Sequence, residues 1–459
     1  MPTGRHSHAH TEKGCLMASE LLFVYTDRPA DAAGRPAGRA SRRWKKIRFL
    51  PSRIVRGSGG PIPSVRPSPA IGGGRPALAS RRMNMDHDPL PADNPATERV
   101  STGILPPDTD VQAIISAGYE RYLHVGEGAV ADYIPALAAA SPTAFGVCVA
   151  GVKGRLFSVG DADQEFAIES ISKLFVFALV CHTLGHEEAR RKLGVNSTGL
   201  PFNSVMAIEL NVDRTMNPLV NAGAVATTSL VPGTTADEKF ESIVAAMSRF
   251  AGRRLVMDED VYESEAATND RNRGIAHLLD GYGRIYCDPD LATDVYTRQC
   301  SVRVSARDLA VMGATLANGG VNPVTGEQAV DTRYCKRVLA VLATAGLYEQ
   351  SGQWLYDVGL PGKSGVAGGI VTVSPGKGGL GTFSPPLDGA GNSVRGQRVT
   401  TYLSEALGLN LFASAPAGLY HRRQSRGLPL PHPAVAKAGD TRLLYDNGKP
   451  YRGGRNLRI

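Results

Sequence analysis

The stretch FAIESISKLFVFALV, residues 166–180, decides the fold. An apolar run from Leu174 to Cys181 has the length of a buried helix, and Ser170 and Lys173 stand just before it. On a helix, residues three apart share one face, so the two side chains could touch. Ser170 would lie at the helix N-terminus, where free backbone N–H groups and the helix dipole favour negative charge. Burial would lower the pKa of Lys173, which could then accept the serine proton.

The Ser-x-x-Lys pattern alone is weak, because Ser170 could be a plain helix cap and Lys173 a surface residue. A second element strengthens it: GLPGKSGVAGG, residues 359–369, contains Lys-Ser-Gly inside a strand-like segment. Ser-x-x-Lys followed by a Lys-Thr-Gly strand is typical of β-lactamases and penicillin-binding proteins. Such a strand can donate a backbone N–H to an oxyanion. Taken alone, Lys-Ser-Gly could equally be a glycine-rich hairpin.

The flanking sequence predicts an α/β fold of the α+β kind, serine β-lactamase-like. Residues 143–161 alternate as a hairpin, and GQWLYDV at 352–358 opens a second strand-rich part. The part between them has helical spacing, as in ARDLAVMGATLANGG, residues 306–320. We therefore expect one antiparallel sheet flanked by helices, built from about 140–165 and 352–400, with an inserted all-helical subdomain at about 185–345. Helical spacing from Val111 to Tyr119 and in SEALGLNLF, residues 404–412, predicts covering helices.

The net charge of +8 over 459 residues is unevenly distributed. Residues 1–84 carry 16 Lys and Arg against 4 Asp and Glu, and residues 413–459 carry 9 against 2. The part between them is acidic, at −11. We therefore expect a disordered basic extension at 1–104, a folded domain at 105–412 and a basic Pro/Arg-rich tail at 413–459. Because the positive charge lies in the tails, we do not expect the folded part to bind nucleic acid.

Three interpretations of the N-terminal extension compete. It could be a functional basic arm, or a transit peptide, since it is rich in Arg and poor in acidic residues. It could also be untranslated, with the true start at Met83 or Met85. The abrupt change of composition at MDHDPLPAD favours the third interpretation.

The six cysteines include no Cys-x-x-Cys pair, which favours free thiols in a reducing cytoplasm. The longest apolar run is far shorter than the roughly 20 residues that span a bilayer, so we expect no membrane segment. The ten histidines do not cluster at metal-ligand spacing, so we expect no metal and no cofactor.

Several further stretches, in this order, make the sequence similar to the serine-dependent glutaminases. They are PFNSVMAIE…NPLVNAGAVATTSL (201–230), SEAATNDRNRGIAHLL (264–279), VYTRQCSV (295–302), AGLYEQSGQW (345–354) and GLPGKSGVAGGI (359–370). The resemblance covers about 110–412. It implies the β-lactamase-like fold, hydrolysis of L-glutamine to L-glutamate and ammonia without a cofactor, and a homodimer or homotetramer.

The resemblance also implies the roles of individual residues. Ser170 would be the nucleophile and Lys173 its base, and Tyr348 or Tyr133 would relay a proton to the leaving ammonia. The N–H groups of Ser170 and Val366 would hold the oxyanion. Glu265 would receive the α-ammonium group of glutamine, and neutral donors its α-carboxylate. The implied substrate-binding residues are Ser170, Asn221, Glu265, Asn272, Tyr296, Tyr348 and Val366.

The sequence departs from the family at two places. Many members have Gln where Glu169 stands and EPSG where residues 196–199 read NSTG. We expect both to lie beside the site, with Glu169 pointing to solvent or perturbing Lys173.

Two alternatives stay open. One is a β-lactamase or D-alanyl peptidase, although no Ser-Asp-Asn element lies between Ser170 and Lys363 and no signal peptide is evident. The other is a non-catalytic relative of the fold, whose basic arm binds nucleic acid.

Overall fold

The computed structural model describes residues 106–214, 216–413, 445–446 and 449–450. At the centre of this part lies a five-stranded sheet, in the order β2-β1-β7-β6-β5, whose neighbouring strands are all antiparallel. Its strands are β1 (Gly146–Gly151), β2 (Leu156–Gly160), β5 (Gly362–Ser364), β6 (Gly369–Ser374) and β7 (Gly378–Phe383). The prediction of one antiparallel sheet built from two distant parts of the chain is therefore confirmed.

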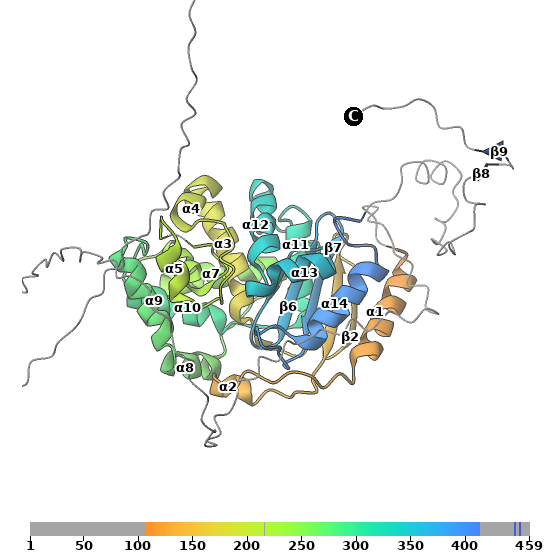
Figure 1. The fold of residues 1–459 in the computed structure, drawn as a ribbon, viewed down its shortest axis with the longest axis horizontal. Helices are drawn as coiled ribbons and strands as arrows, with labels where there is room; N and C mark the ends of the chain where they lie inside the picture. Colours follow the sequence, from red (N-terminus) through yellow and green to blue (C-terminus); the bar gives the residue numbers. More distant parts are fainter. Residues whose placement is uncertain (1–105, 215, 414–444, 447–448, 451–459) are drawn as a thin grey trace, which may run out of the picture. The chain divides into compact units, whose positions relative to one another are not determined.

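Strand β1 joins the two parts, since Val147 pairs with Val159 of β2 and with Thr382 of β7. Alternate residues of a strand point to opposite faces of its sheet. Val147 and Val149 face a core shared with α1 (Asp108–Tyr122) and α14 (Val394–Ala406). Cys148 and Ala150 face α11 (Ala306–Ala317). The sheet is thus covered by helices on both faces (Figure 1).

Helix α11 lies very close to the sheet, and glycines of β7 make this possible. A Cβ atom on Gly379 or Gly381 would collide with backbone carbonyl oxygens of α11, at Ala310 and Ala306. The glycine-rich sequence of β7 is therefore a packing requirement of this face.

The part between the two groups of strands is helical, as expected, and it forms the α3–α10 region of Figure 1. Helix α11 belongs to the same stretch of sequence but packs on the sheet, so the helical insert and the sheet share a core. A short pair of strands, β3 (Phe166–Ala167) and β4 (Arg303–Val304), lies at the entrance to this part. Its other elements are the turn η1 (Glu169–Ile171) and the helices α3 (Ser172–Leu184), α4 (His186–Leu193), α5 (Val205–Leu210), α6 (Asn221–Ser229), α7 (Ala236–Ala251), α8 (Glu259–Ala267), α9 (Asp270–Gly281), α10 (Pro289–Cys300) and α12 (Thr332–Ala345). The short helix α2 (Pro135–Ala138) precedes the sheet, and the turn η2 (Tyr348–Gln350) follows α12.

Two predictions about the C-terminal part were wrong. Residues 352–358 do not form a strand: they belong to helix α13 (Ser351–Val358). Trp354 and Val358 are buried one helical turn apart, and the Trp354 indole N–H donates to the carbonyl of Leu360 at 2.8 Å.

The sheet also ends earlier than predicted, at Phe383. The closing helix begins at Val394, ten residues before the predicted 404, and ends at Ala406. The Ser393 hydroxyl accepts a hydrogen bond from the N–H of Gly396 and so caps this start.

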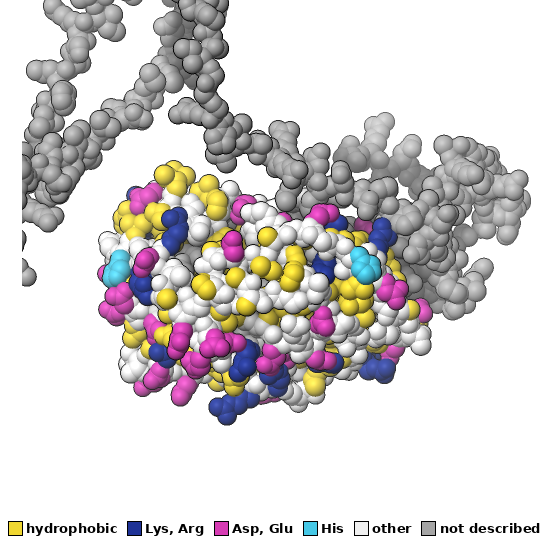
Figure 2. All heavy atoms as spheres, turned by 90° about the horizontal axis from the view of Figure 1, so that it is seen from below, with side chains coloured by type: hydrophobic (Ala, Val, Ile, Leu, Met, Phe, Trp, Pro, Cys, Tyr) yellow, Lys and Arg dark blue, Asp and Glu magenta, His cyan; other side chains and the backbone are white. Residues whose placement is uncertain are grey.

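The predicted boundaries of the tails stay predictions, since residues 1–105 and most of 414–459 lie outside the described part. Within the predicted C-terminal tail the structure describes one short antiparallel pair, β8 (Tyr445–Asp446) and β9 (Lys449–Pro450). Figure 2 shows acidic side chains spread over one face of the described domain, with Lys and Arg side chains among them. None of the described helices combines the length and the apolar character that crossing a bilayer requires.

Candidate active site

The segment that carries Ser170 runs from strand β3 through the turn η1 into helix α3. Ser170 lies in the turn, and Lys173 lies in the first turn of the helix that follows. The Ser172 hydroxyl donates to the carbonyl of Glu169 at 2.7 Å and fixes the junction. Apolar side chains bury α3 on nearly all sides, as its sequence predicted. The site is therefore anchored on an element that runs through the core.

Lys173 is buried, with 1% of its surface exposed. Burial lowers its pKa to about 8, although the carboxyl groups of Glu169 and Glu265 oppose the shift. Its Nζ donates to Oδ1 of Asn221 at 2.7 Å and lies 5.7 Å from the centre of the Tyr296 ring. An appreciable fraction of Lys173 is thus neutral near neutral pH, as a general base requires.

Asn221, which accepts from Lys173, is the first of three asparagines whose side-chain amides are linked by hydrogen bonds. Nδ2 of Asn221 donates to Oδ1 of Asn272 at 2.9 Å, and Nδ2 of Asn272 donates to Oδ1 of Asn269 at 2.6 Å. The Tyr296 hydroxyl donates to Oδ1 of Asn221 at 3.4 Å. Each amide nitrogen has two hydrogens, so Asn221 and Asn272 each keep one for a further acceptor. The structure thus brings Lys173, Asn221, Asn272 and Tyr296 together.

Strand β5 carries Lys363 and Ser364 of Lys-Ser-Gly, and Gly365, which follows the strand, lies beside the serine turn. A Cβ atom on Gly365 would lie 2.8 Å from the carbonyl oxygen of Ile168, so only glycine allows this approach. Val366 follows and is buried. A Cβ atom on Gly391 would lie within 4 Å of both Val366 and Tyr348, so these two side chains border the same loop.

Tyr348 is buried and has a φ of 56°, in the left-handed region that is unusual for a bulky residue. Its hydroxyl donates to the carbonyl of Ser364 at 3.3 Å. Burial raises its pKa, and hydrogen bonding with Ser170 acts in the opposite direction, which places the phenol at the serine. Nζ of Lys363 lies 4.1 Å from the centre of the Tyr348 ring and donates to the same carbonyl at 2.8 Å, and burial lowers the pKa of this lysine well below its ordinary value.

Tyr133 lies at the rim of the site, with 56% of its surface exposed. Burial of its hydroxyl end raises the pKa, and the nearby groups of Tyr348, Glu169 and Glu265 act in the same direction. Tyr133 therefore combines a solvent-facing ring with a hydroxyl that faces the site.

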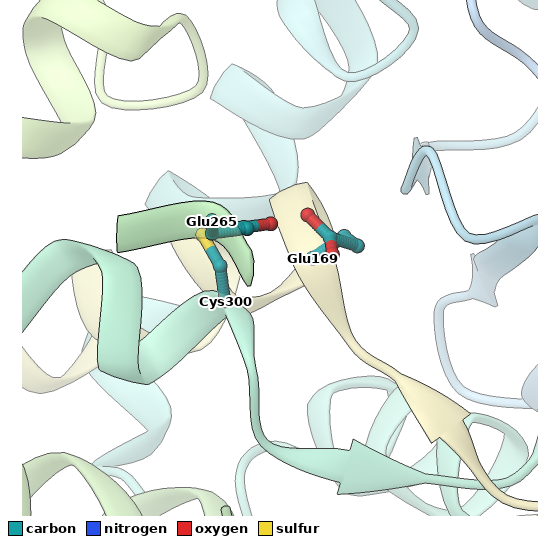
Figure 3. A group of neighbouring side chains, drawn as sticks. All are labelled: Glu169, Glu265 and Cys300. Atoms are coloured by element: carbon teal, nitrogen blue, oxygen red, sulfur yellow. The ribbon is translucent and has the colours of Figure 1, made fainter. Parts of the chain in front are cut away.

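Glu169 is placed differently from our expectation. Only 4% of its surface is exposed, so the alternative that it points to solvent was wrong. The other alternative agrees with the structure, because the Glu169 carboxyl group acts to raise the pKa of Lys173. One oxygen of Glu169, one of Glu265 and Sγ of Cys300 lie within 4.8 Å of one another. Figure 3 shows the Glu265 carboxyl group extended toward Glu169, with the Cys300 sulfur beside Glu265. Glu169 thus belongs to the site and does not lie beside it.

The sequence analysis also left out Cys300 and Lys363 as site residues. Cys300 lies one turn after Tyr296 on α10, and Lys363 begins the Lys-Ser-Gly strand; these positions were the available signals. Carboxylates and a thiolate could together hold a divalent cation. Burial, however, raises the pKa of the Cys300 thiol well above its ordinary value, and the charge of Lys173 only opposes this shift. The thiol therefore stays protonated, which disfavours a metal at this cluster.

Comparisons with known proteins agree with this geometry. A sequence model of the family described as Glutaminase matches residues 128–412. "Glutaminase 2" of Yersinia pestis is 56% identical over 335 residues, which cover 72% of this chain and 98% of that protein. The solved structure of the "Probable glutaminase ybaS" has a TM-score of 0.66 and 43% identity, covering 67% of this chain and 99% of that one. A structure of Mglu "in its glutamate form" has a TM-score of 0.62 and 41% identity, covering 65% of this chain and 69% of that one.

Proposed function

Because this chain belongs to the glutaminase family, we propose that it hydrolyses the side-chain amide of L-glutamine through an ester on Ser170. The reaction consumes L-glutamine and water and yields L-glutamate and ammonia. The observation that carries the mechanism is Lys173: a fully buried lysine, its pKa lowered to about 8, placed one helical turn after a serine.

In the first half of the reaction, neutral Lys173 takes the hydroxyl proton of Ser170 while Oγ attacks the amide carbon. The N–H groups of Ser170 and Val366 hold the oxyanion, which the close approach of the Gly365 turn to the serine turn supports. The C–N bond then breaks, and the nitrogen leaves as ammonia with a proton from Tyr348 or Tyr133. The Lys173 ammonium returns a proton to that tyrosine, so that Lys173 is neutral again for the second half. The γ-glutamyl group remains on Ser170.

In the second half, water attacks the ester carbon and gives its proton to the base. The C–O bond to Ser170 breaks, the serine oxygen regains a proton, and L-glutamate leaves. No metal ion or cofactor takes part in this scheme.

The amino-acid end of glutamine is bound by charge and by hydrogen bonds. Glu265 receives the α-ammonium group. Asn221, Asn272 and Tyr296 lie together and provide neutral donors for the α-carboxylate. The solved structure of Mglu in its glutamate form supports a pocket for this amino acid in the family.

We further propose that the protein works in the cytoplasm as a homodimer or homotetramer. The described cysteines are free, and most are buried, which suits a reducing compartment. Light scattering of the purified chain measures the assembly, and a monomer at working concentration would contradict it.

The test of the reaction is the release of ammonia and glutamate from L-glutamine by the full chain and by Ser170→Ala. Ser404→Ala is the matched control, since Ser404 is equally buried but donates to the carbonyl of Val358, outside the site. We expect release by the wild type and the control and none by Ser170→Ala. Turnover of a β-lactam but not of glutamine by the wild type would contradict the proposal.

A further inference from the structure

Glu169 carries a buried carboxyl group whose Oε1 has no hydrogen-bond partner among the described residues. Its backbone has a φ of 54°, which is rare for a residue with a side chain. Desolvation of a carboxyl oxygen without a hydrogen-bond donor is unfavourable, so such an oxygen in a site points to a ligand that supplies the donor.

The second carboxyl group of the cluster belongs to a different element. Glu265 comes from α8, whereas Glu169 precedes α3, and their oxygens lie within 4.8 Å of each other and of Cys300 Sγ (Figure 3). Glu169 is buried and Glu265 is half-buried. Two carboxyl groups at this separation repel each other strongly when both are ionised, which favours one proton held between them. Burial and the neighbouring Glu265 raise the pKa of Glu169 well above its usual range. The pKa of Glu265 is also raised by burial, but its hydrogen bond with Glu169 acts in the opposite direction. The greater rise at Glu169 favours the proton on Glu169 and the negative charge on Glu265.

The other titratable groups around the pair are few and mostly neutral. They are Cys300 and Tyr296 of α10, Lys173 of α3, Tyr348 of η2, Tyr133 before α2 and, beyond them, Lys363 of β5. Burial raises the pKa of the thiol and of the phenols, so all four stay protonated and uncharged at neutral pH. Lys173 directs its Nζ to Asn221. Lys173 therefore leaves the unpartnered oxygen of Glu169 available as an acceptor for another cationic donor.

We propose that the carboxyl groups of Glu169 and Glu265 together receive the α-ammonium group of the substrate, and that Glu169 releases its proton when this group arrives. The identity of that substrate rests on the proposed function. The O–H bond of Glu169 breaks and its proton passes to solvent buffer, while the ammonium keeps its three hydrogens and donates to both carboxylates. A Gln side chain at position 169 could accept a hydrogen bond from the substrate but could not supply a negative charge. Glu169 therefore makes the affinity for the substrate depend on pH.

The proposal makes a quantitative statement about affinity. If binding releases a proton, affinity rises with pH by up to about tenfold per pH unit for each proton released. Below the titration of Glu169 both the wild type and Glu169→Gln present one carboxylate, Glu265. We therefore expect the KM ratio of Glu169→Gln to wild type to rise from near unity at pH 6 to about tenfold at pH 8.5.

Calorimetry measures the proton directly, in the full-length Ser170→Ala background, where L-glutamine binds without turnover. Titrations in two buffers of different ionisation enthalpy give the number of protons released. We expect release by Ser170→Ala and none by Ser170→Ala/Glu169→Gln. Equal release by both, or a KM ratio that does not change with pH, would overturn the proposal.

Two further arms keep the test decisive. Glutaramic acid is L-glutamine without its α-ammonium group, and its binding to Ser170→Ala should release no proton. Proton release would overturn the proposal, and this arm needs no substitution of Glu169. Pretreatment with EDTA should change neither profile, and a change would make the cluster a metal site instead. If the wild type does not hydrolyse glutamine and Ser170→Ala does not bind it, the proposed function fails. Hydrolysis with an equal proton count in both variants rejects the role of Glu169 alone.

Discussion

Replacing Lys173 by Met should abolish turnover and at the same time stabilise the fold at neutral pH. The side chain is 1% exposed, and its pKa falls from 10.5 to about 8 on folding. This shift of 2.5 units corresponds to about 3 kcal/mol of destabilisation at pH 7, since each unit is about 1.4 kcal/mol. Met has a similar length and carries no charge that must be desolvated.

The loss of one hydrogen bond offsets part of this gain. Oδ1 of Asn221 loses its donor at 2.7 Å, which costs about 1–3 kcal/mol, although Tyr296 still donates to the same oxygen. At pH 7 we therefore expect Lys173→Met to be between equally stable and about 2 kcal/mol more stable than the wild type.

The difference in stability between Lys173→Met and the wild type should also depend on pH, which gives a more specific prediction. A lysine with a lowered folded pKa binds fewer protons when folded, so wild-type stability rises with pH between about 8 and 10.5. The variant lacks this contribution, so its advantage should shrink by about 2 kcal/mol between pH 7 and pH 9.5.

The assay is urea unfolding followed by circular dichroism at both pH values, with ammonia release measured on the same samples. Lys239→Met is the matched control, because Lys239 is buried and donates to the carbonyls of Ser229 and Val231, outside the site. This control should keep turnover. The reasoning would be refuted if Lys173→Met differed from the wild type by the same free energy of unfolding at both pH values. Turnover of glutamine by Lys173→Met would also refute it.

Three further predictions concern rate and stability. The wild-type kcat/KM, which reports groups of the free protein, should rise as the pH passes about 8, because only neutral Lys173 accepts a proton; a flat profile from pH 6 to 9 would exclude this base. In Gly365→Ala, the new Cβ would lie 2.8 Å from the carbonyl oxygen of Ile168 and displace the serine turn. We expect kcat to fall by about tenfold or more with the variant still folded, and an unchanged kcat would refute the close approach. Asp308→Ala removes the buried carboxylate that completes the capping box of α11 by accepting from the N–H of Ser305, and that also accepts two hydrogen bonds from Arg253, at 2.8 and 2.7 Å. It should cost about 2–4 kcal/mol, seen as a lower urea midpoint with the kcat of the remaining folded protein unchanged.

Local patterns in the sequence predicted the main elements because their signals are short-range. The apolar run after Lys173 predicted a buried helix, and alternation in residues 143–161 predicted the first hairpin. Residues 352–358 were misassigned because a short apolar run satisfies both strand and helix periodicities. The burial of Trp354 and Val358 one turn apart became evident only once their partners were placed.

The residues of the site also differ in whether a local pattern in the sequence could predict them. Ser170 and Lys173 could be paired by spacing alone, whereas Asn221, Glu265 and Tyr296 are far apart in sequence and were placed only through the family resemblance. The direction of the Glu169 side chain could not be predicted, because it depends on a left-handed backbone conformation at that residue. Its partner Glu265 comes from another helix, which no local pattern connects to the serine turn.

The most direct test of the account is to trap the intermediate on Ser170. The full-length wild type is mixed with L-glutamine, quenched in acid within the first turnover and digested, and the peptide that contains Ser170 is weighed by mass spectrometry. The account predicts a mass increase of one glutamyl residue on Ser170, which is absent from Lys173→Met and from samples without glutamine. Rapid ammonia release with no modified peptide, or with the glutamyl group on another residue, would contradict it.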